Sequence, residues 1–122
     1  MGEQEDLIAA WDWLTQQKDW DDQVLIGYSF GAAMAWAAQA RCRGRSRLVL
    51  IAPPNAAMPF DAPDGAQGDA PTVYSISGSS DSYVAPQALP ASVQQQVLDG
   101  ADHFFSSHAH ALQAAIAAVL DG

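Results

Sequence analysis

An uncharged stretch runs from Val24 to Ala40 in a chain that is otherwise rich in carboxylates. It begins with the apolar run Val24–Ile26, continues through a turn of glycine and serine, and ends in an alanine-rich segment. The stretch is shorter than a usual membrane span, and small polar residues interrupt it. The pattern therefore predicts a buried strand, a sharp turn and a helix from Phe30 to Arg41.

Other segments of strand and helix composition alternate along the chain. The elements predicted besides this unit are a helix at 5–17, strands at 47–52, 72–77 and 93–98, a long loop at 55–70, a short turn or helix at 86–89 and a helix at 106–120. Short apolar strands that alternate with helices indicate a parallel sheet with crossover helices. Three glutamines, Gln94–Gln96, favour an edge position for the strand at 93–98.

The last predicted helix has a recognisable apolar face and a serine cap. Its predicted buried residues are Ala109, Leu112, Ile116 and Val119. Ser106 or Ser107 is expected to cap its N-terminus, since serine hydroxyls accept hydrogen bonds from the first free N–H groups of a helix.

Length and charge restrict the class of function. The chain has 122 residues, so residues 1–122 are expected to form a single domain. Its 14 carboxylates against 5 lysines and arginines disfavour nucleic acid and anionic membranes as partners. The single cysteine, Cys42, cannot form an internal disulfide, and the acidic N-terminus does not resemble a signal peptide. These features favour a cytoplasmic protein.

The sequence Gly27-Tyr28-Ser29-Phe30-Gly31 is the strongest indication of chemistry. It lies between a predicted strand and a predicted helix, which is the setting of a G-x-S-x-G nucleophile elbow. Both glycines are expected to leave the space that a strained turn around the serine requires. The backbone N–H of Phe30 would then face the place where an oxyanion forms.

A serine hydroxyl is a weak nucleophile and needs a base, for which the chain offers three histidines. His103 is the preferred base because it follows a predicted strand. His108 and His110 fall in the predicted last helix and are expected to be solvated. These histidines do not predict a metal site, because His108 and His110 are two residues apart and face different sides of a helix.

The base in turn needs a carboxylate that orients it. Asp81 is preferred because it directly follows the strand at 72–77. The carboxyl ends of parallel strands share one edge of a sheet, so Ser29, Asp81 and His103 would converge there. The alternatives that stay open for the acid are Asp61, Asp99 and Asp102.

Four segments resemble the α/β-hydrolase superfamily, above all its small lidless bacterial members of the dienelactone-hydrolase-like type. They are Gly-Tyr-Ser-Phe-Gly at 27–31, Ala-Pro-Pro at 52–54, Gly-Ser-Ser-Asp-Ser-Tyr-Val-Ala-Pro at 78–86 and Gly-Ala-Asp-His-Phe-Phe at 100–105. The resemblance implies an α/β fold, a truncated three-layer sandwich whose mostly parallel sheet has about four strands flanked by helices. It corresponds to the C-terminal portion of the usual fold. By the same resemblance Ser29 is the nucleophile, Asp81 the acid and His103 the base, and Phe30 supplies one oxyanion-hole N–H.

The resemblance further implies a serine hydrolase of carboxylic esters or related acyl substrates that works through an acyl-enzyme, without cofactor or metal. Tyr28, Met58 and Phe60 are expected to border the substrate. The alternative is a non-catalytic or degenerate hydrolase-fold module that acts as an interaction or assembly partner. In the family that the sequence resembles, a loop near the start of the fold carries a second oxyanion-hole amide, and we expect this chain to lack that loop.

Hydrolases of this family usually begin with several more strands and a first helix, which we expect this chain to lack. Without those strands, the strand at Val24–Tyr28 would be an apolar sheet edge, and an exposed edge of this kind pairs readily with another strand. We therefore expect a homo-oligomer such as a homodimer through that edge, or a complementing chain.

Overall fold

The structure is a computed structural model that describes residues 23–38, 46–61 and 71–121. Its elements are β1 (Gln23–Tyr28), α2 (Phe30–Ala38), β2 (Ser46–Ile51), β3 (Thr72–Gly78), the 3-10 turn η2 (Pro86–Ala88), β4 (Gln94–Leu98) and α3 (Ala109–Asp121). The strands occupy the segments where the sequence predicts them. The helix predicted at 5–17 lies outside the described residues.

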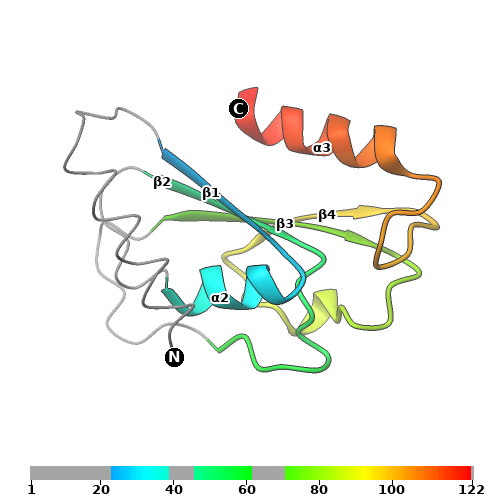
Figure 1. Ribbon diagram of the computed structural model, residues 1–122. Helices are drawn as coiled ribbons and strands as arrows, with labels where there is room; N and C mark the ends of the chain where they lie inside the picture. Colours follow the sequence, from blue (N-terminus) through cyan, green and yellow to red (C-terminus); the bar gives the residue numbers. More distant parts are fainter. Residues whose placement is uncertain (1–22, 39–45, 62–70, 122) are drawn as a thin grey trace.

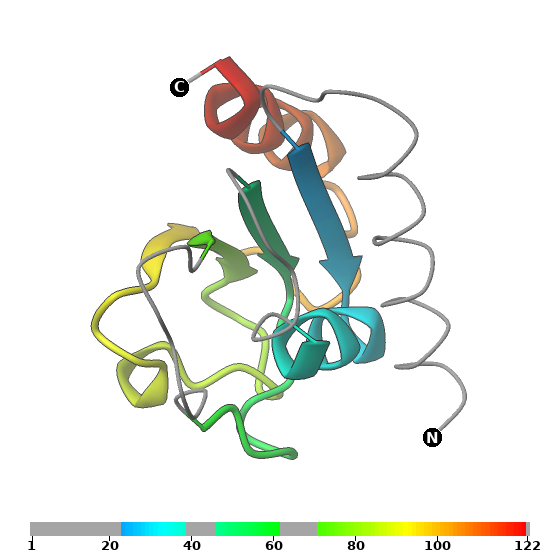
Figure 2. The same cartoon turned by 90° about the vertical axis from the view of Figure 1, so that its left-hand side faces the viewer.

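The four strands form one parallel sheet in the order β1-β2-β3-β4. Helix α2 packs on one face of the sheet and α3 on the other (Figures 1 and 2). This arrangement confirms the predicted α/β sandwich with a parallel sheet. Within the described sheet β4 pairs with β3 alone, and its residues Gln94–Gln96 are exposed, so the predicted edge position is confirmed.

Small and aromatic side chains fill the space between α2 and the sheet. Ala32, Ala35 and Trp36 of the helix pack against Leu48 and Leu50 of β2, and all five are at most 6% exposed. Alanines let α2 approach the strands closely, so the start of the helix is held firmly at the end of β1. This fixes the turn that joins the two elements.

Helix α3 begins at Ala109 rather than at Ser106, where the sequence predicts its start. Phe105 and Ser107 have φ angles of 55° and 64°, in the left-handed region that a right-handed helix excludes. The residues before Ala109 therefore turn instead of extending the helix, and His108, rather than either predicted serine, precedes its first residue.

The buried face of α3 differs in part from the predicted one. Leu112, Ile116 and Val119 pack against the core as predicted. Ala109 is exposed, and Ala115 is the buried residue of the helix.

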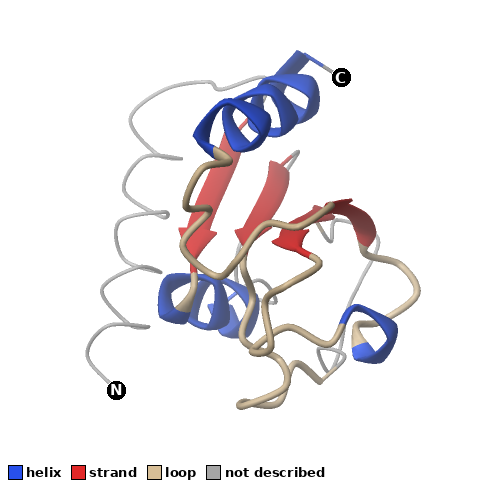
Figure 3. Cartoon of the chain, turned by 90° about the vertical axis from the view of Figure 1, so that its right-hand side faces the viewer, coloured by secondary structure: helices blue, strands red, loops and turns tan. Residues whose placement is uncertain are grey.

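All four strands point the same way, so the loops that follow them lie at one edge of the sheet (Figure 3). The loop after β1 carries Ser29, the loop after β3 carries Asp81, and the loop after β4 carries His103. The topology therefore brings residues distant in sequence to a common edge.

Candidate active site

Ser29 lies in the turn between β1 and α2, and its backbone is strained. Its φ angle is 55°, which is unfavourable for a residue with a side chain and costs on the order of 1–3 kcal/mol. The Ser29 N–H donates to the Ile51 carbonyl at 2.8 Å, and this bond ties the turn to β2. The turn thus presents the serine hydroxyl at the edge of the sheet.

The two glycines of the turn have different roles. A Cβ on Gly27 would lie 2.5 Å from the Gly31 carbonyl oxygen, so this position accepts no side chain without a shift of the backbone. A Cβ on Gly31 would have no heavy atom within 4 Å. The expectation that both glycines are needed for space therefore holds for Gly27 and is wrong for Gly31, whose own Cα faces open space.

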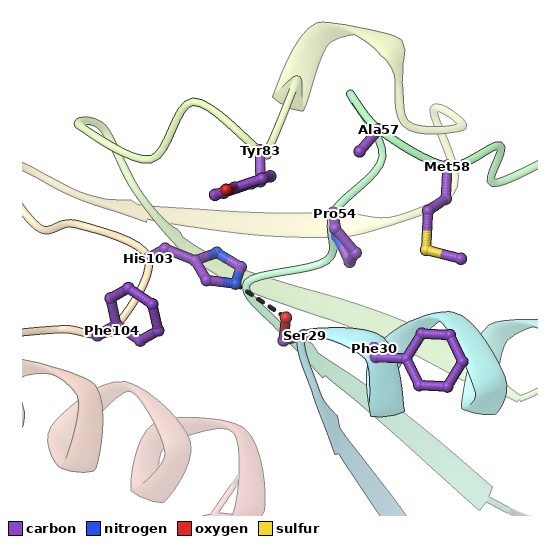
Figure 4. A pocket seen from close by; sticks show the side chains of 8 residues that line it. All are labelled: Ser29, Phe30, Pro54, Ala57, Met58, Tyr83, His103 and Phe104. Atoms are coloured by element: carbon purple, nitrogen blue, oxygen red, sulfur yellow. Dashed lines mark hydrogen bonds between the residues drawn. The ribbon is translucent and has the colours of Figure 1, made fainter.

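Ser29, His103 and Asp81 form a continuous chain of polar contacts. Ser29 Oγ lies 2.8 Å from His103 Nε2, and His103 Nδ1 lies 2.7 Å from Asp81 Oδ2 (Figure 4 shows the first contact). The side chains of His103 and Asp81 are 12% and 0% exposed. Because a carboxylate only accepts, the Nδ1 atom carries the proton and the Nε2 atom is free to accept from the serine hydroxyl.

Asp81 is held by its own loop as well as by the histidine. Its second oxygen, Oδ1, accepts the N–H of Tyr83 at 2.9 Å. The other carboxylates considered for the acid have different partners. Asp61 is exposed and accepts from Trp36 through its backbone oxygen, Asp99 contacts Ser79, and Asp102 accepts N–H groups of its own loop. The structure therefore places Asp81 alone of these four against His103.

The loops after β3 and β4 pack tightly on each other. The Ser80 N–H donates to the Ala101 carbonyl at 2.9 Å, and the Gly100 N–H donates to Ser79 Oγ at 2.7 Å. A Cβ on Gly78 would lie 2.1 Å from the Ala101 oxygen, so only glycine allows this approach. The distance between Asp81 and His103 is thus set by direct contact between the two loops.

Tyr28 supports the backbone of the histidine loop. Its hydroxyl donates to the His103 carbonyl oxygen at 2.9 Å, and its ring centroid lies 5.9 Å from that of His103. Loss of hydration, followed by the charges of Asp81 and Asp102, raises the pKa of Tyr28 above its usual value of 10.0. The hydroxyl therefore keeps its proton at neutral pH and remains a donor. Residue spacing alone did not indicate this role.

The histidine loop is also ordered from within. Asp102 Oδ1 accepts the N–H groups of Ser106 at 2.9 Å and Phe104 at 3.1 Å. These bonds, the one from Ser106 first, lower the pKa of Asp102 below its usual value of 3.8. The carboxylate is therefore charged at neutral pH and fixes the turn that follows His103.

A cavity of about 400 Å³ opens beside the serine and the histidine. It is lined by Ser29, Phe30, Pro54, Ala57, Met58, Tyr83, His103 and Phe104 (Figure 4). Met58 thus lies where the sequence predicts a substrate contact. Phe60 does not line the cavity: it is buried in the core, with its ring centroid 5.8 Å from that of Trp36. Tyr28 is not among the lining residues either, and its hydroxyl donates to the His103 backbone.

The start of α2 offers a donor for a developing negative charge. The Ser29 carbonyl accepts the N–H groups of Ala32 and Ala33, so the Phe30 N–H precedes the first bonds of the helix and has no acceptor within it. Phe30 also lines the cavity next to Ser29. Its N–H can therefore serve a ligand oxygen at the serine, at the positive end of the helix dipole.

Two further findings concern the described residues only. In residues 23–38, 46–61 and 71–121, no three histidine, cysteine or acidic side chains are grouped so that they could hold a metal ion. Over the same ranges, no helix has the length and apolar character to span a membrane.

Comparison with protein-family models and with curated proteins found no match to the sequence. Among solved structures, the chain is similar to an α/β serine hydrolase without lid from Xanthomonas campestris, with a TM-score of 0.74 and 30% identity over 94% of this chain and 54% of that one. An α/β serine hydrolase homologue from Coxiella burnetii gives a TM-score of 0.74 and 26% identity over 93% and 56% of the two chains.

A protein of unknown function from Agrobacterium tumefaciens shares the fold, with a TM-score of 0.79 and 24% identity over 98% of this chain and 59% of that one. The chain thus spans somewhat more than half the length of each of these structures. The parallel sheet, the turn around Ser29 and these likenesses show that the chain has an α/β-hydrolase-like fold, as its sequence motifs predict.

Proposed function

We propose that this chain is a serine hydrolase that cleaves carboxylic esters or related acyl substrates through an acyl-enzyme. The observation that supports this most is the chain of contacts from Ser29 Oγ through the His103 ring to Asp81. The likeness to serine hydrolases supports the same class of reaction. These side chains come from three separate loops, and a structural role alone does not require them to meet beside a cavity.

In the first half of the proposed reaction, Ser29 Oγ attacks the ester carbonyl carbon while its proton passes to His103 Nε2. The electron pair of the carbonyl moves to its oxygen, which the Phe30 N–H stabilises. Asp81 holds the Nδ1 proton and stabilises the charged imidazolium. The bond from carbon to the leaving oxygen then breaks, and Nε2 returns its proton to the departing alcohol.

In the second half, water replaces the alcohol. His103 Nε2 takes a proton from the water, whose oxygen attacks the acyl carbon and restores the oxyanion. Collapse breaks the bond to Ser29 Oγ, which regains its proton from Nε2, and the carboxylic acid leaves. We assign one oxyanion donor within the described residues, the Phe30 N–H, and a site with one donor fewer turns over about 10²–10³ times more slowly.

A fluorophosphonate probe tests the proposal because it labels only a serine that is activated as a nucleophile. We expect labelling of the wild type and turnover of p-nitrophenyl butyrate, with both lost in Ser29→Ala. Ser82→Ala is the matched control, since Ser82 is an exposed serine in the Asp81 loop. Equal labelling of Ser29→Ala and wild type would refute the assignment of the nucleophile.

The second candidate function is a non-catalytic hydrolase-fold module that acts as an interaction partner. One observation favours it: the chain matches only 54–59% of the length of the similar structures. A wild type that neither labels nor hydrolyses any ester, yet is folded by circular dichroism, would support this function against the hydrolase.

We also propose that the β1 edge pairs with a second copy of the chain. Among the described strands β1 pairs with β2 alone, and its residues Ile26 and Tyr28 are each 45% exposed. Light scattering should give a homo-oligomer that Ile26→Lys dissociates, because a charge on an edge strand opposes pairing. A wild-type monomer at working concentration would contradict this. A cytoplasmic location stays a prediction from the sequence.

A further inference from the structure

The surroundings of Ser29 point to the substrate class. We propose that the site takes esters whose acyl group is uncharged and apolar, and that it discriminates against acyl groups that carry a carboxylate. This inference rests on the proposed function. It has two parts: which side of the cavity holds the acyl part of the ester, and whether that side accepts a charged group.

The position of His103 assigns the two sides of the cavity. His103 must give its proton to the leaving oxygen, so the alcohol part of the ester lies on the side of the histidine. Tyr83 and Phe104 stand there, with ring centroids 4.9 Å and 5.3 Å from that of His103 (Figure 4). The acyl part then lies on the other side of Ser29, where Pro54 and Met58 line the cavity.

The acyl side is apolar. Pro54, Ala57 and Met58 come from the segment after β2 and carry no charge and no side-chain hydrogen-bond donor. A carboxylate placed against them would lose water and gain no partner, which is costly for a charged group. An alkyl chain would bury surface there at a gain of about 25 cal/mol per Å².

Within the part of the chain that the structure describes, the loops at this edge of the sheet carry no lysine or arginine. The sequence contains no lysine or arginine after Arg47, and none between Gln23 and Ala38. The described residues that line the cavity all belong to these two stretches. Arg47 itself stands near the start of β2, at the opposite end of the strand, and donates to the carbonyls of Val119 and Leu120. An anionic acyl group would therefore find no lysine or arginine as a counter-ion among the described residues of the cavity.

The charged side chains near His103 are carboxylates, which would repel an anionic acyl group. Asp81 lies directly behind His103, and Asp102 precedes His103 in its loop. Both carboxylates raise the pKa of Tyr28, so their negative field reaches the region around the histidine. The chain as a whole carries a net charge of −9, which adds long-range repulsion of anions at low ionic strength.

The experiment compares two esters of equal chain length. p-Nitrophenyl hexanoate and the p-nitrophenyl monoester of adipic acid differ in the terminal methyl or carboxylate of the acyl chain. Each rate is corrected for the rate measured with Ser29→Ala. We expect kcat/KM at least tenfold higher for the hexanoate, with a difference that narrows as salt screens the repulsion. An adipate monoester hydrolysed as fast as the hexanoate would overturn the inference and leave the proposed function standing.

A cation placed on the acyl side should change this preference. Met58→Lys is expected to lower the ratio of hexanoate to adipate rates by at least tenfold relative to Met58→Gln, which is polar without charge. Ala117→Lys adds the same charge on the exposed surface of α3 and controls for net charge. A ratio that Ala117→Lys changes as much as Met58→Lys would refute the assigned acyl side.

The two hypotheses fail in different ways. If neither ester is hydrolysed and Ser29 does not react with a fluorophosphonate, the proposed function fails and the substrate class falls with it. If Ser29 hydrolyses both esters at equal rates, only the proposed preference for uncharged acyl groups is refuted.

Discussion

The turn that carries Ser29 and the loop that carries His103 are positioned in different ways. The turn lies between β1 and α2, which are adjacent in sequence, and its shape depends on a close approach of Gly27 to the Gly31 carbonyl. The histidine loop lies between β4 and α3, and its contacts reach the Tyr28 hydroxyl, the Asp81 carboxylate and the backbone after β3.

This difference separates local from tertiary control of the site. The turn around Ser29 is shaped by the close approach within it and is tied to β2 by one backbone hydrogen bond, so substitutions disturb it mainly through sterics. A base placed by three distant partners can be moved by changes far away in the sequence. Substitutions in the turn and in the histidine loop should therefore differ in effect.

Asp81→Asn should have the largest effect on the histidine side. The amide can donate to Nδ1, which favours the tautomer with the proton on Nε2, so His103 can no longer accept from the serine. We expect kcat to fall about 10⁴-fold with the fold intact. The measurement is ester turnover together with circular dichroism.

The control for this change is Asp61→Asn, at an exposed carboxylate whose backbone oxygen alone is bonded to Trp36. A loss in Asp61→Asn as large as that in Asp81→Asn would show that the acid is misassigned.

Gly27→Ala should break the turn on the serine side. The new Cβ would lie 2.5 Å from the Gly31 oxygen, so strand and helix must separate. Overpacking of this kind costs about 1–3 kcal/mol. We expect a lower free energy of unfolding in urea and loss of fluorophosphonate labelling.

Gly31→Ala is the matched control, because its Cβ meets no atom within 4 Å. Alanine is also the better helix former by about 0.8–1.0 kcal/mol, so the variant should keep or gain stability. Equal destabilisation by both substitutions would contradict the steric role assigned to Gly27 alone.

Tyr28→Phe tests the direct link between the two regions. It removes the hydrogen bond to the His103 carbonyl and keeps the ring. A hydrogen bond of this kind contributes about 0.5–1.5 kcal/mol, which corresponds to roughly a 2- to 12-fold loss of kcat/KM if it holds the base in place. Tyr83→Phe, which removes the hydroxyl of another aromatic neighbour of His103, serves as the comparison.

Asp102→Asn should have the smallest effect, seen in the pH dependence of stability. The Asp102 pKa is lowered in the folded chain, so its carboxylate stabilises the fold above the unfolded pKa. That stabilisation is lost as the pH falls through the folded pKa. The Tm of the variant should lie slightly below that of wild type at pH 7, and the difference should vanish toward pH 3. A difference that grows on acidification would contradict the assigned hydrogen bonds.

The strands could be predicted because buried parallel strands are nearly continuous apolar runs, as in Arg47–Ala52. The turn around Ser29 could be predicted because its glycine spacing is local. The start of α3 could not, since the left-handed backbone at Phe105 and Ser107 depends on bonds to Asp102 and on packing of the loop.

Apolar character did not predict which side chains line the cavity. Met58 and Phe60 are two residues apart, and composition does not distinguish them. The structure buries Phe60 against Trp36 and leaves Met58 beside Ser29. The indole N–H of Trp36 also donates to the Asp61 carbonyl, which holds this segment in place.

The sequence by itself determined which segments form strands, the turn that exposes Ser29 and the absence of lysine and arginine after Arg47. These follow from runs and spacings within one segment, where local sterics and burial act. The tertiary structure alone decided that Asp81, rather than three other aspartates, contacts His103, and that the Tyr28 hydroxyl bonds to the backbone of this histidine. Such choices depend on the contact of separate loops at the sheet edge, because hydrogen bonds form only where distant backbones come within about 3 Å.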